Sequence, residues 1–413
     1  MKKAVKFVGY AILAIAVIVG GIAAYVAIIG IPSYSPGHVT LQVNVTPEKV
    51  EHGRKYMTLL CATCHMDPTT GRLTGKRIVD MPAQFGSAYS KNITQDRVHG
   101  IGNWTDGEIA FFLRTGIDRR GQYVPPWMPK FPHMSDDDLE SVIAFLRSND
   151  PLVAAVPVAP PGVSHPSFLA KLLSYVVFKP LPYPQARITA PPTSDKVAYG
   201  RYLSSVIGCY GCHSADFKTM NELEPEKSAG YMGGGNAMPD QAGQIVPTAN
   251  ITFDETGINR WTEADFTRAV RTGVTPSRTV LAYPMVPMPE LTETDTAALY
   301  AYLRTVPKIS HRVARVERRP APTDADGNTL YHKYGCPSCH GEHGVGIGDL
   351  RHATEHYPTD PQLEAWIRDA PAIKPGTKMP TWNGVIRESD YAPLMQYVKE
   401  LGRAAGESDD ERR

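Results

Sequence analysis

Three five-residue stretches decide what kind of protein this chain is: Cys61-Ala-Thr-Cys64-His65, Cys209-Tyr-Gly-Cys212-His213 and Cys336-Pro-Ser-Cys339-His340. The chain has six cysteines, and these stretches use all of them. In a Cys-x-x-Cys-His motif the two thiols add to the vinyl groups of a haem, and the histidine coordinates the iron from the same turn. A zinc site would need further ligand pairs, and no cysteine is spare for one. The sequence therefore predicts three covalently bound haem c groups.

Residues 1–33 are expected to form a transmembrane anchor. An uncharged apolar run extends from Phe7 to Ile31, which as a helix measures roughly 37 Å and spans a hydrocarbon core of about 30 Å. A cleaved signal peptide is the alternative, but its apolar region is typically about 7 to 15 residues long. Three lysines precede the run and the next one is Lys49. The positive-inside rule therefore places the N-terminus in the cytoplasm and the haem-bearing part in the periplasm, at a bacterial inner membrane.

Length and charge limit the remaining possibilities. A chain of 413 residues is too long for a single core and is expected to form several domains. The net charge is +1, with 21% charged residues. That balance gives no electrostatic reason to expect nucleic acid as a partner.

An internal repeat defines the units. Asn92-Ile-Thr-Gln-Asp96 returns as Asn250-Ile-Thr-Phe-Asp254, 158 residues later, and Trp104-Thr105 returns as Trp261-Thr262, 157 residues later. Each block follows its own cysteine motif, so the repeated unit is a whole haem domain. The expected order after the anchor is cytochrome c domains at 45–150, 193–305 and 323–401, a proline-rich linker at 151–192, a basic linker at 306–322 and a charged tail at 402–413.

Helix signals recur in each unit. A leading helix runs into each cysteine motif, beginning after Thr46 with Pro47 at its first position, and after Ser194-Asp195. Capping boxes predict middle helices at Thr105 and Thr262. Closing helices are expected at 135–147, 292–304 and roughly 388–401. No alternating strand pattern is comparably strong, so the fold class is all-α: three cytochrome-c-like domains in tandem after one transmembrane helix.

The connecting segments carry their own expectations. Residues 151–192 are expected to be extended, apart from an apolar insert from Phe168 to Phe178. This insert packs on its own domain, lies on the membrane surface or docks on a partner. The basic linker 306–322 is interpreted as solvated, with a docking strip as the alternative, and the tail 402–413 is expected to be disordered.

Methionine is the candidate sixth ligand of each iron. Met379 lies in Gly376-Thr-Lys-Met-Pro380, a polar loop where a core methionine is not expected. In the first unit, Met128 lies in Pro125-Pro-Trp-Met-Pro129. Alignment of the closing helices places Met285 opposite Met128, so these two are the candidates in the first and second units.

Two nearby methionines are weaker candidates. The same alignment places Met134 opposite Leu291, which predicts a core position for Met134. Met288 remains a competitor of Met285 in the second unit.

Other residues near the motifs receive ordinary structural interpretations. Trp104 and Trp261 are expected to form haem-pocket walls and helix starts rather than a substrate site. The glycine-rich run 341–348 follows a haem motif rather than a strand, so it is expected to be a tight turn along the haem edge and not a nucleotide loop. Surface or haem-edge positions are expected for four histidines: His133, His343, His352 and His356.

The motifs and repeats together resemble the tri-haem cytochrome c subunits of membrane-bound bacterial dehydrogenases for alcohols, gluconate, sorbitol, fructose and aldehydes. The resemblance covers roughly residues 45 to 400. It implies a separate periplasmic subunit that oxidises the substrate with pyrroloquinoline quinone or flavin, and electron transfer through the haems to quinone or a terminal oxidase. Members of the alcohol and gluconate type usually have a cleaved signal, whereas this chain is expected to keep a spanning helix.

The leading hypothesis is therefore a membrane-anchored electron carrier that has no catalytic residues of its own. One alternative is a subunit of a respiratory or photosynthetic complex, or a stand-alone membrane-tethered shuttle. Another is a haem peroxidase-type enzyme, which would need an iron with an open sixth position. A methionine candidate in every unit argues against that enzyme.

Overall fold

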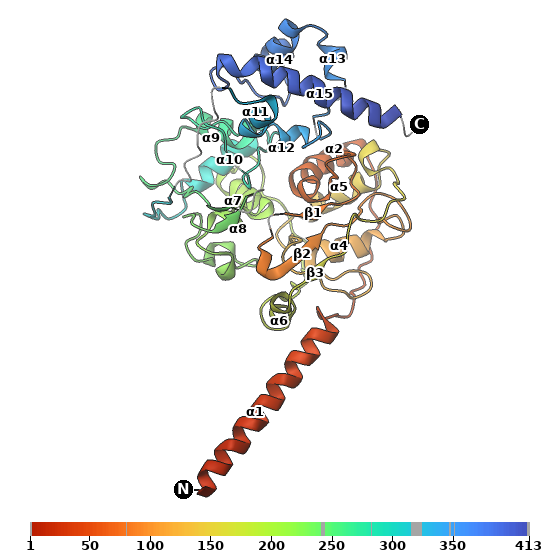
Figure 1. The fold of residues 1–413 in the computed structure, drawn as a ribbon, viewed down its shortest axis with the longest axis vertical. Helices are drawn as coiled ribbons and strands as arrows, with labels where there is room; N and C mark the ends of the chain where they lie inside the picture. Colours follow the sequence, from red (N-terminus) through yellow and green to blue (C-terminus); the bar gives the residue numbers. More distant parts are fainter. Residues whose placement is uncertain are drawn as a thin grey trace.

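The computed structural model describes residues 2–79, 81–240, 244–281, 283–314, 324–346, 348–350 and 352–410. Its globular part is mostly helical and contains three pairs of contacting helices (Figure 1). In each pair a leading helix contacts a closing helix. The pairs are α2 (Pro47–Tyr56) with α5 (Asp136–Leu146), α7 (Lys196–Ile207) with α10 (Glu293–Leu303), and α11 (Gly327–Lys333) with α15 (Tyr391–Asp410).

Other helices and short strands complete the globular part. The helices are α3 (Thr63–His65), α4 (Asp106–Thr115), α6 (Phe168–Val176), α8 (Cys209–His213), α9 (Glu263–Thr272), α12 (Pro337–His340), α13 (Ala353–His356) and α14 (Asp360–Ile373). Two small antiparallel sheets accompany them, one of β1 (Arg77–Ile78), β2 (Gly86–Tyr89) and β3 (His165–Pro166), the other of β4 (Ala237–Pro239) and β5 (Ile245–Pro247).

The helix starts confirm the predicted capping residues. The Thr46 side chain accepts a hydrogen bond from Lys49 N, and Asp195 caps α7. Both predicted capping boxes are present, at Thr105 and at Thr262. Such caps satisfy main-chain donors that a helix cannot satisfy itself, which is why they can be predicted from a few neighbouring residues.

A glycine lies where each leading helix crosses its closing helix. A Cβ atom at Gly53 would lie 1.9 Å from Ser141 O, at Gly200 2.0 Å from Ala298 O, and at Gly327 2.3 Å from Pro393 O. Only glycine permits such close approach of two backbones. The same contact therefore recurs three times along the chain.

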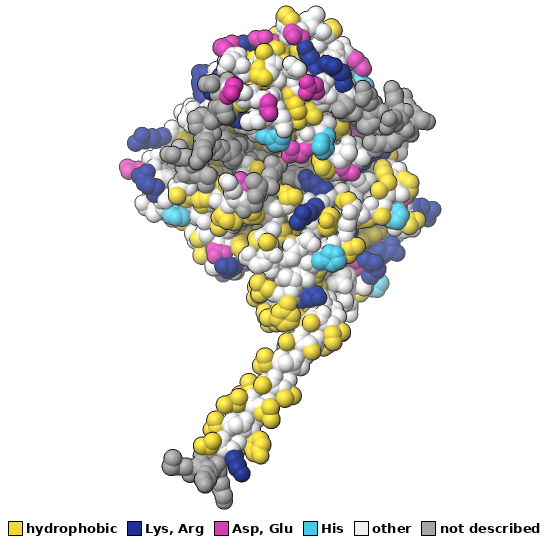
Figure 2. Space-filling view, in the orientation of Figure 1, with side chains coloured by type: hydrophobic (Ala, Val, Ile, Leu, Met, Phe, Trp, Pro, Cys, Tyr) yellow, Lys and Arg dark blue, Asp and Glu magenta, His cyan; other side chains and the backbone are white. Residues whose placement is uncertain are grey.

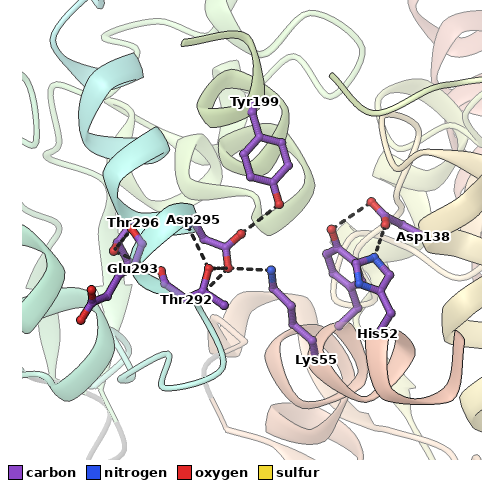
Figure 3. A network of polar contacts seen from close by, with 9 residues as sticks. His52, Lys55, Asp138, Tyr199, Thr292, Glu293, Asp295 and Thr296 are labelled. Atoms are coloured by element: carbon purple, nitrogen blue, oxygen red, sulfur yellow. Dashed lines mark hydrogen bonds and ion pairs between the residues drawn. The ribbon is translucent and has the colours of Figure 1, made fainter. Parts of the chain in front are cut away.

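The first two helix pairs share one hydrophobic core, whereas the third has its own. Polar contacts join the first two pairs as well (Figure 3). Lys55 on α2 reaches Asp295 at the start of α10 (Nζ–Oδ2 2.7 Å), and Tyr202 on α7 donates to Asp138 at the start of α5. Burial alone would raise the pKa of Asp295, but the positive charge of Lys55 and its hydrogen bonds hold that pKa below its usual value. The carboxylate is therefore charged where it meets Lys55.

Helix α1 (Lys2–Ile29) extends away from the globular part and shows apolar side chains along its length (Figure 2). Its segment Val5–Ile29 is long and apolar enough to cross a membrane. At its C-terminal end it meets α6: the rings of Tyr25 and Tyr175 lie 5.9 Å apart, and Lys171 Nζ donates to Ala27 O.

The apolar insert is helical and only partly packed. Ala170 and Ser174 on α6 are buried against the protein, but other apolar side chains of the insert are exposed: Phe168, Leu169, Val176 and Val177. The extended part of the 151–192 segment lies against the first helix pair, where Val156 O and Val158 O accept hydrogen bonds from Asn92.

The tail differs from its prediction. Helix α15 continues to Asp410, so the expectation of disorder after residue 401 is wrong as far as that residue. Ala404 and Ala405 have the strongest intrinsic helix preference of any residue, which favours continuation of the helix. Residues 315–322 of the predicted basic linker lie outside the described part of the chain.

Replacing Gly200 with alanine tests the helix crossing. We expect Gly200→Ala to lower the free energy of unfolding by about 1–3 kcal/mol, because the added methyl group collides with Ala298 O. Thermal unfolding followed by far-UV circular dichroism measures the change. Ser205→Ala on the exposed face of the same helix is the control, and equal stability of the two variants would contradict the prediction.

Candidate haem sites

Each cysteine motif forms a short helical turn directly after its leading helix. The motifs occupy the end of η1 (Met57–Ala62) with α3, the whole of α8, and α12 with the residue before it. All six cysteines are half-buried and free of disulfide bonds. Each turn therefore presents two thiols and one imidazole from five consecutive residues.

The three motif histidines make the same hydrogen bond. Nδ1 lies 2.7 Å from Lys91 O in His65, 2.8 Å from Ala249 O in His213 and 2.6 Å from Gly348 O in His340. A carbonyl oxygen only accepts, so Nδ1 carries the proton and donates it, which leaves the lone pair on Nε2. A hydrogen bond of this kind from the other ring nitrogen orients a histidine ligand toward a metal.

Burial favours the neutral form of these imidazoles. It lowers the pKa of His65, His213 and His340 below the ordinary histidine value, and the carbonyl hydrogen bonds only partly offset this. A neutral imidazole is the form that binds iron.

The Asn-Ile-Thr repeats hold two of the carbonyl acceptors in place. Asn250 follows Ala249; its Oδ1 accepts from Thr252 N at 2.9 Å, and its Nδ2 donates to Ile309 O at 2.8 Å. Asn92 makes the corresponding contacts after Lys91. The sequence analysis found these repeats but missed this role, because the distant partners at 156, 158, 309 and 311 carry no recognisable motif.

The third motif uses the glycine run instead. Gly348, at the end of the run, supplies the carbonyl that accepts from His340. A Cβ atom there would lie 2.9 Å from His340 Nδ1, so the close approach requires glycine. Residues 341–346 form turns, as predicted for the run, and Gly348 adds the acceptor that the sequence analysis did not assign.

A cavity of about 570 Å³ adjoins the third motif. Both His340 and Met379, predicted as the two iron ligands, line it, as do Cys336 and Cys339. Its walls are largely apolar or aromatic, including Tyr331, Leu350, Leu363, Trp366, Ile367, Trp382 and Leu394. Size, apolar lining and donor set fit a covalently attached haem.

The main chain supports the predicted alignment of the first two methionine loops. Phe131 N donates to Leu113 O, and Met288 N donates to Val270 O, so Met288 corresponds to Phe131. The same register places Met285 opposite Met128. Iron ligation by Met128 and Met285 stays a prediction.

Met134 and Leu291 correspond to each other in that register, and each is 1% exposed. Met134 is therefore a core residue, as predicted.

The four histidines that were expected at surface or haem-edge positions occupy several environments. His343 and His352 are exposed. His133 Nε2 lies 2.8 Å from Glu222 O, a contact between the first and second units. His356 lines the third cavity, which agrees with a haem-edge position.

Trp104 and Trp261 pack against the shared core directly before the caps of α4 and α9, as the predicted helix starts require. Their role as haem-pocket walls stays a prediction.

The cysteine environment is unlike that of a thiol-disulfide site. Burial raises the pKa of the Cys61 and Cys336 thiols to about 12 and that of Cys209 to about 11, whereas reactive Cys-x-x-C thiols have lowered pKa values. Within the described residues, no group of three or more His, Cys, Asp or Glu side chains could hold a metal ion. Raised thiol pKa values do not favour thiol-disulfide exchange.

Thiol pairs, adjacent histidines and helix crossings define a c-type cytochrome. The cytochrome c family model matches residues 50–150 and 325–402. The fructose dehydrogenase cytochrome subunit of Gluconobacter japonicus is 28% identical over 325 residues, which cover 70% of this chain and 63% of the relative. The cytochrome c subunit of the quinone-type alcohol dehydrogenase of Gluconacetobacter polyoxogenes is 26% identical over 308 residues, 70% of this chain and 64% of that relative.

A shorter relative, the "diheme cytochrome c-type" protein of Cereibacter sphaeroides, is 26% identical over 60% of this chain and 82% of its own length. The chain spans just under two thirds of the length of the fructose and alcohol dehydrogenase subunits. The chain therefore carries a cytochrome c domain, which binds haem c covalently, and it is similar to the cytochrome c subunits of fructose, alcohol and gluconate dehydrogenases.

Gly348→Ala tests the histidine hydrogen bond. The added methyl group collides with the His340 ring, so we expect the bond to Gly348 O to be lost. A histidine without this bond is a weaker electron donor, so one redox component should move to higher potential in a spectroelectrochemical titration. Gly211→Ala is the control, because its Cβ would meet only Met220 Sδ, at 3.4 Å. An unchanged titration of Gly348→Ala would contradict the prediction.

Proposed function

We propose that this protein is a membrane-anchored tri-haem cytochrome c that relays single electrons from a periplasmic dehydrogenase subunit to quinone or a terminal oxidase. The observation that carries the proposal is the threefold recurrence of one local arrangement. Each copy combines a glycine helix crossing, a Cys-x-x-Cys-His turn and a histidine Nδ1–carbonyl hydrogen bond. Three copies support three domains and three haems, and a denatured mass three haem groups above that of the polypeptide tests the number.

Bound haem supplies a one-electron change between ferric and ferrous iron. The thiols of each motif would hold the haem, and the motif histidine, oriented by its carbonyl partner, would bind the iron. Met128, Met285 and Met379 would supply the second protein ligand, and a thioether ligand raises the reduction potential relative to a second histidine. An iron held by two protein ligands would leave no open position for a substrate, which favours electron transfer over catalysis.

A small cavity of about 140 Å³ supports a relay between the units. Ala62 and Thr63, between the first pair of motif cysteines, line it from one side, and Pro337 and Ser338, between the third pair, line it from another. Met288 of the second unit also lines this cavity. The turns that would hold the first and third haems therefore line one space, which favours direct electron exchange between these two sites.

Helix α1 is the proposed anchor, with the N-terminus in the cytoplasm and the haem domains in the periplasm. Its position beside α6 supports this, because the exposed apolar side chains of α6 lie next to the end of the hydrophobic segment. The three basic residues near the N-terminus favour that orientation. The third unit lies at the end of the molecule opposite α1 (Figure 1), accessible to a periplasmic partner.

Purification in mild detergent distinguishes the proposed partner from the alternatives. Co-isolation of a dehydrogenase subunit would support the proposal. Co-isolation of an oxidase or a quinol-oxidising complex would instead assign the protein to a respiratory or photosynthetic assembly.

Met379→Ala tests the third axial ligand. Without the thioether, His340 is the one proposed protein ligand left for this iron. Because one of three proposed haems is opened, we expect carbon monoxide to bind about one third of the ferrous haem. Met395→Ala is the control, since Met395 is a buried residue of the same core and its loss should lower stability without opening the iron. If Met379→Ala binds no more carbon monoxide than the unmodified protein, the assignment is refuted.

Deletion of residues 2–29, with a cleavable export signal in their place, tests the anchor. We expect the haem protein to move from the membrane pellet to the soluble periplasmic fraction, because about 25 apolar residues are the principal source of membrane affinity. Haem absorbance after ultracentrifugation measures the distribution. If the truncated protein remains in the pellet after a high-salt wash, α1 is not the main anchor.

A further inference from the structure

The third cavity is not closed by the third unit alone. Its lining includes six residues of the second unit: Arg271, Thr272, Val280, Leu281, Pro287 and Pro289. Four of them lie in residues 271–281, which comprise the end of α9 and the loop that follows and are called the bridging loop below. The same cavity is lined by residues of the third unit that include Cys336 and His340.

The bridging loop is part of the third core. Val274 is 4% exposed and belongs to the same apolar cluster as Leu330 and Trp382. Val280 packs against that cluster, and its Cγ1 lies 3.4 Å from where a Cβ on Gly335 would be. The loop therefore excludes water from the cavity in the way that a core segment does.

The corresponding loop of the first unit contacts a different part of the chain. Both loops close with the same type of bridge, Ile117 with Tyr123 and Val274 with Val280. In the first unit, however, Tyr34 N donates to Gly121 O, so that loop contacts the segment after α1. The covering of a haem cavity by the second loop is thus not a general consequence of the repeat.

The two loops differ at one position in a way that matches their different neighbours: Gly121 in the first corresponds to Arg278 in the second. Gly121 has φ +83°, and its counterpart Arg278 has φ +58°, a left-handed conformation that residues other than glycine rarely adopt. The guanidinium of Arg278 reaches toward Gly384 O in the third unit, at 3.5 Å. A long side chain at a position suited to glycine is consistent with a loop that is adapted to the third unit.

Arg271 adds a charge to this wall. In the first unit its counterpart is Arg114, whose guanidinium donates hydrogen bonds to Phe131 O, Met134 O and Asp136 Oδ1. Arg271 lies 3.9 Å from Glu293, and within the described part of the chain its buried Nε has no hydrogen-bond partner. A haem carries carboxylate groups, and guanidinium is the side chain that best matches a carboxylate.

We infer that the bridging loop of the second unit is a wall of the third haem site and sets the reduction potential of that haem. Val274 and Val280 keep water out, and Arg271 supplies positive charge. Both effects favour the ferrous state, because a less solvated site and a nearby cation each disfavour the additional positive charge of ferric iron. This inference rests on the proposed third haem.

The first step of the test identifies the third haem in the full-length detergent-solubilised protein. Met379→His should move one component of the spectroelectrochemical titration to lower potential, because histidine replaces methionine as the axial ligand. That component is the third haem. If no component moves, the proposed ligation fails, independently of the bridging loop.

The second step tests the apolar wall. Val280→Ser should lower the potential of the component identified by Met379→His and leave the other two unchanged. Val197→Ser, at an exposed position on α7, is the control and should change none. If the third component stays in place in Val280→Ser, or if all three move together, the inference is overturned.

The third step tests the charge. Arg271→Gln should decrease the ratio of reduced to oxidised third haem, at a fixed ambient potential, by about tenfold, as expected for loss of a unit charge near a partly buried site. Arg271→Lys should retain most of the original ratio. Arg268→Gln, on the exposed face of the same helix and paired with Asp265, should leave it unchanged. Equal ratios in Arg271→Gln and the unmodified protein would refute the role of Arg271.

Discussion

The close contact between a leading and a closing helix is the constraint on which the haem sites depend. At Gly53, Gly200 and Gly327 the leading helix almost touches a carbonyl of its partner. The cysteine turn follows the leading helix, and the methionine loop precedes the closing helix. Because the crossing fixes the two helices relative to each other, it also fixes the thiols and histidine relative to the predicted sixth ligand. A larger residue at the crossing would separate the two halves of the site.

The first two units are joined more tightly than a tandem arrangement requires. They share a core, and each supplies a side chain to the first turn of the other's closing helix, Lys55 to Asp295 and Tyr202 to Asp138. An acidic residue in the first turn of a helix already benefits from the helix dipole, and Lys55 of the first unit adds a charge contact to Asp295 of the second unit across the interface. The relative position of these two units is therefore set by packing and not by the linker between them, which makes the distance between their haem motifs a fixed property of the fold.

Sequence reasoning succeeded where the cause of the structure is local. The caps at Thr46, Thr105 and Thr262 depend on residues within four positions, and the core position of Met134 follows from its alignment with Leu291 just ahead of the corresponding helix. It missed what depends on distant backbone: the carbonyl acceptors Lys91 and Ala249, which any residue type could supply, and the shared core. The extension of α15 beyond residue 401 was missed for another reason, because charged composition was given more weight than the helix preference of two alanines.

The third site could not be predicted from the third unit alone, because a loop of the second unit lines its cavity. The repeat places the same loop in two units, at 116–124 and 273–281, but the two copies contact different neighbours: the segment after α1 in one case and the third cavity in the other. Sequence comparison alone shows that Gly121 and Arg278 differ without showing why. The contacts of each loop give the difference a physical reason. Gly121 has no side chain and can approach the backbone at Tyr34. The long side chain of Arg278 reaches the third unit. Asymmetry among similar units thus arises at their surfaces, where each contacts something different, while the helix crossings beneath stay the same.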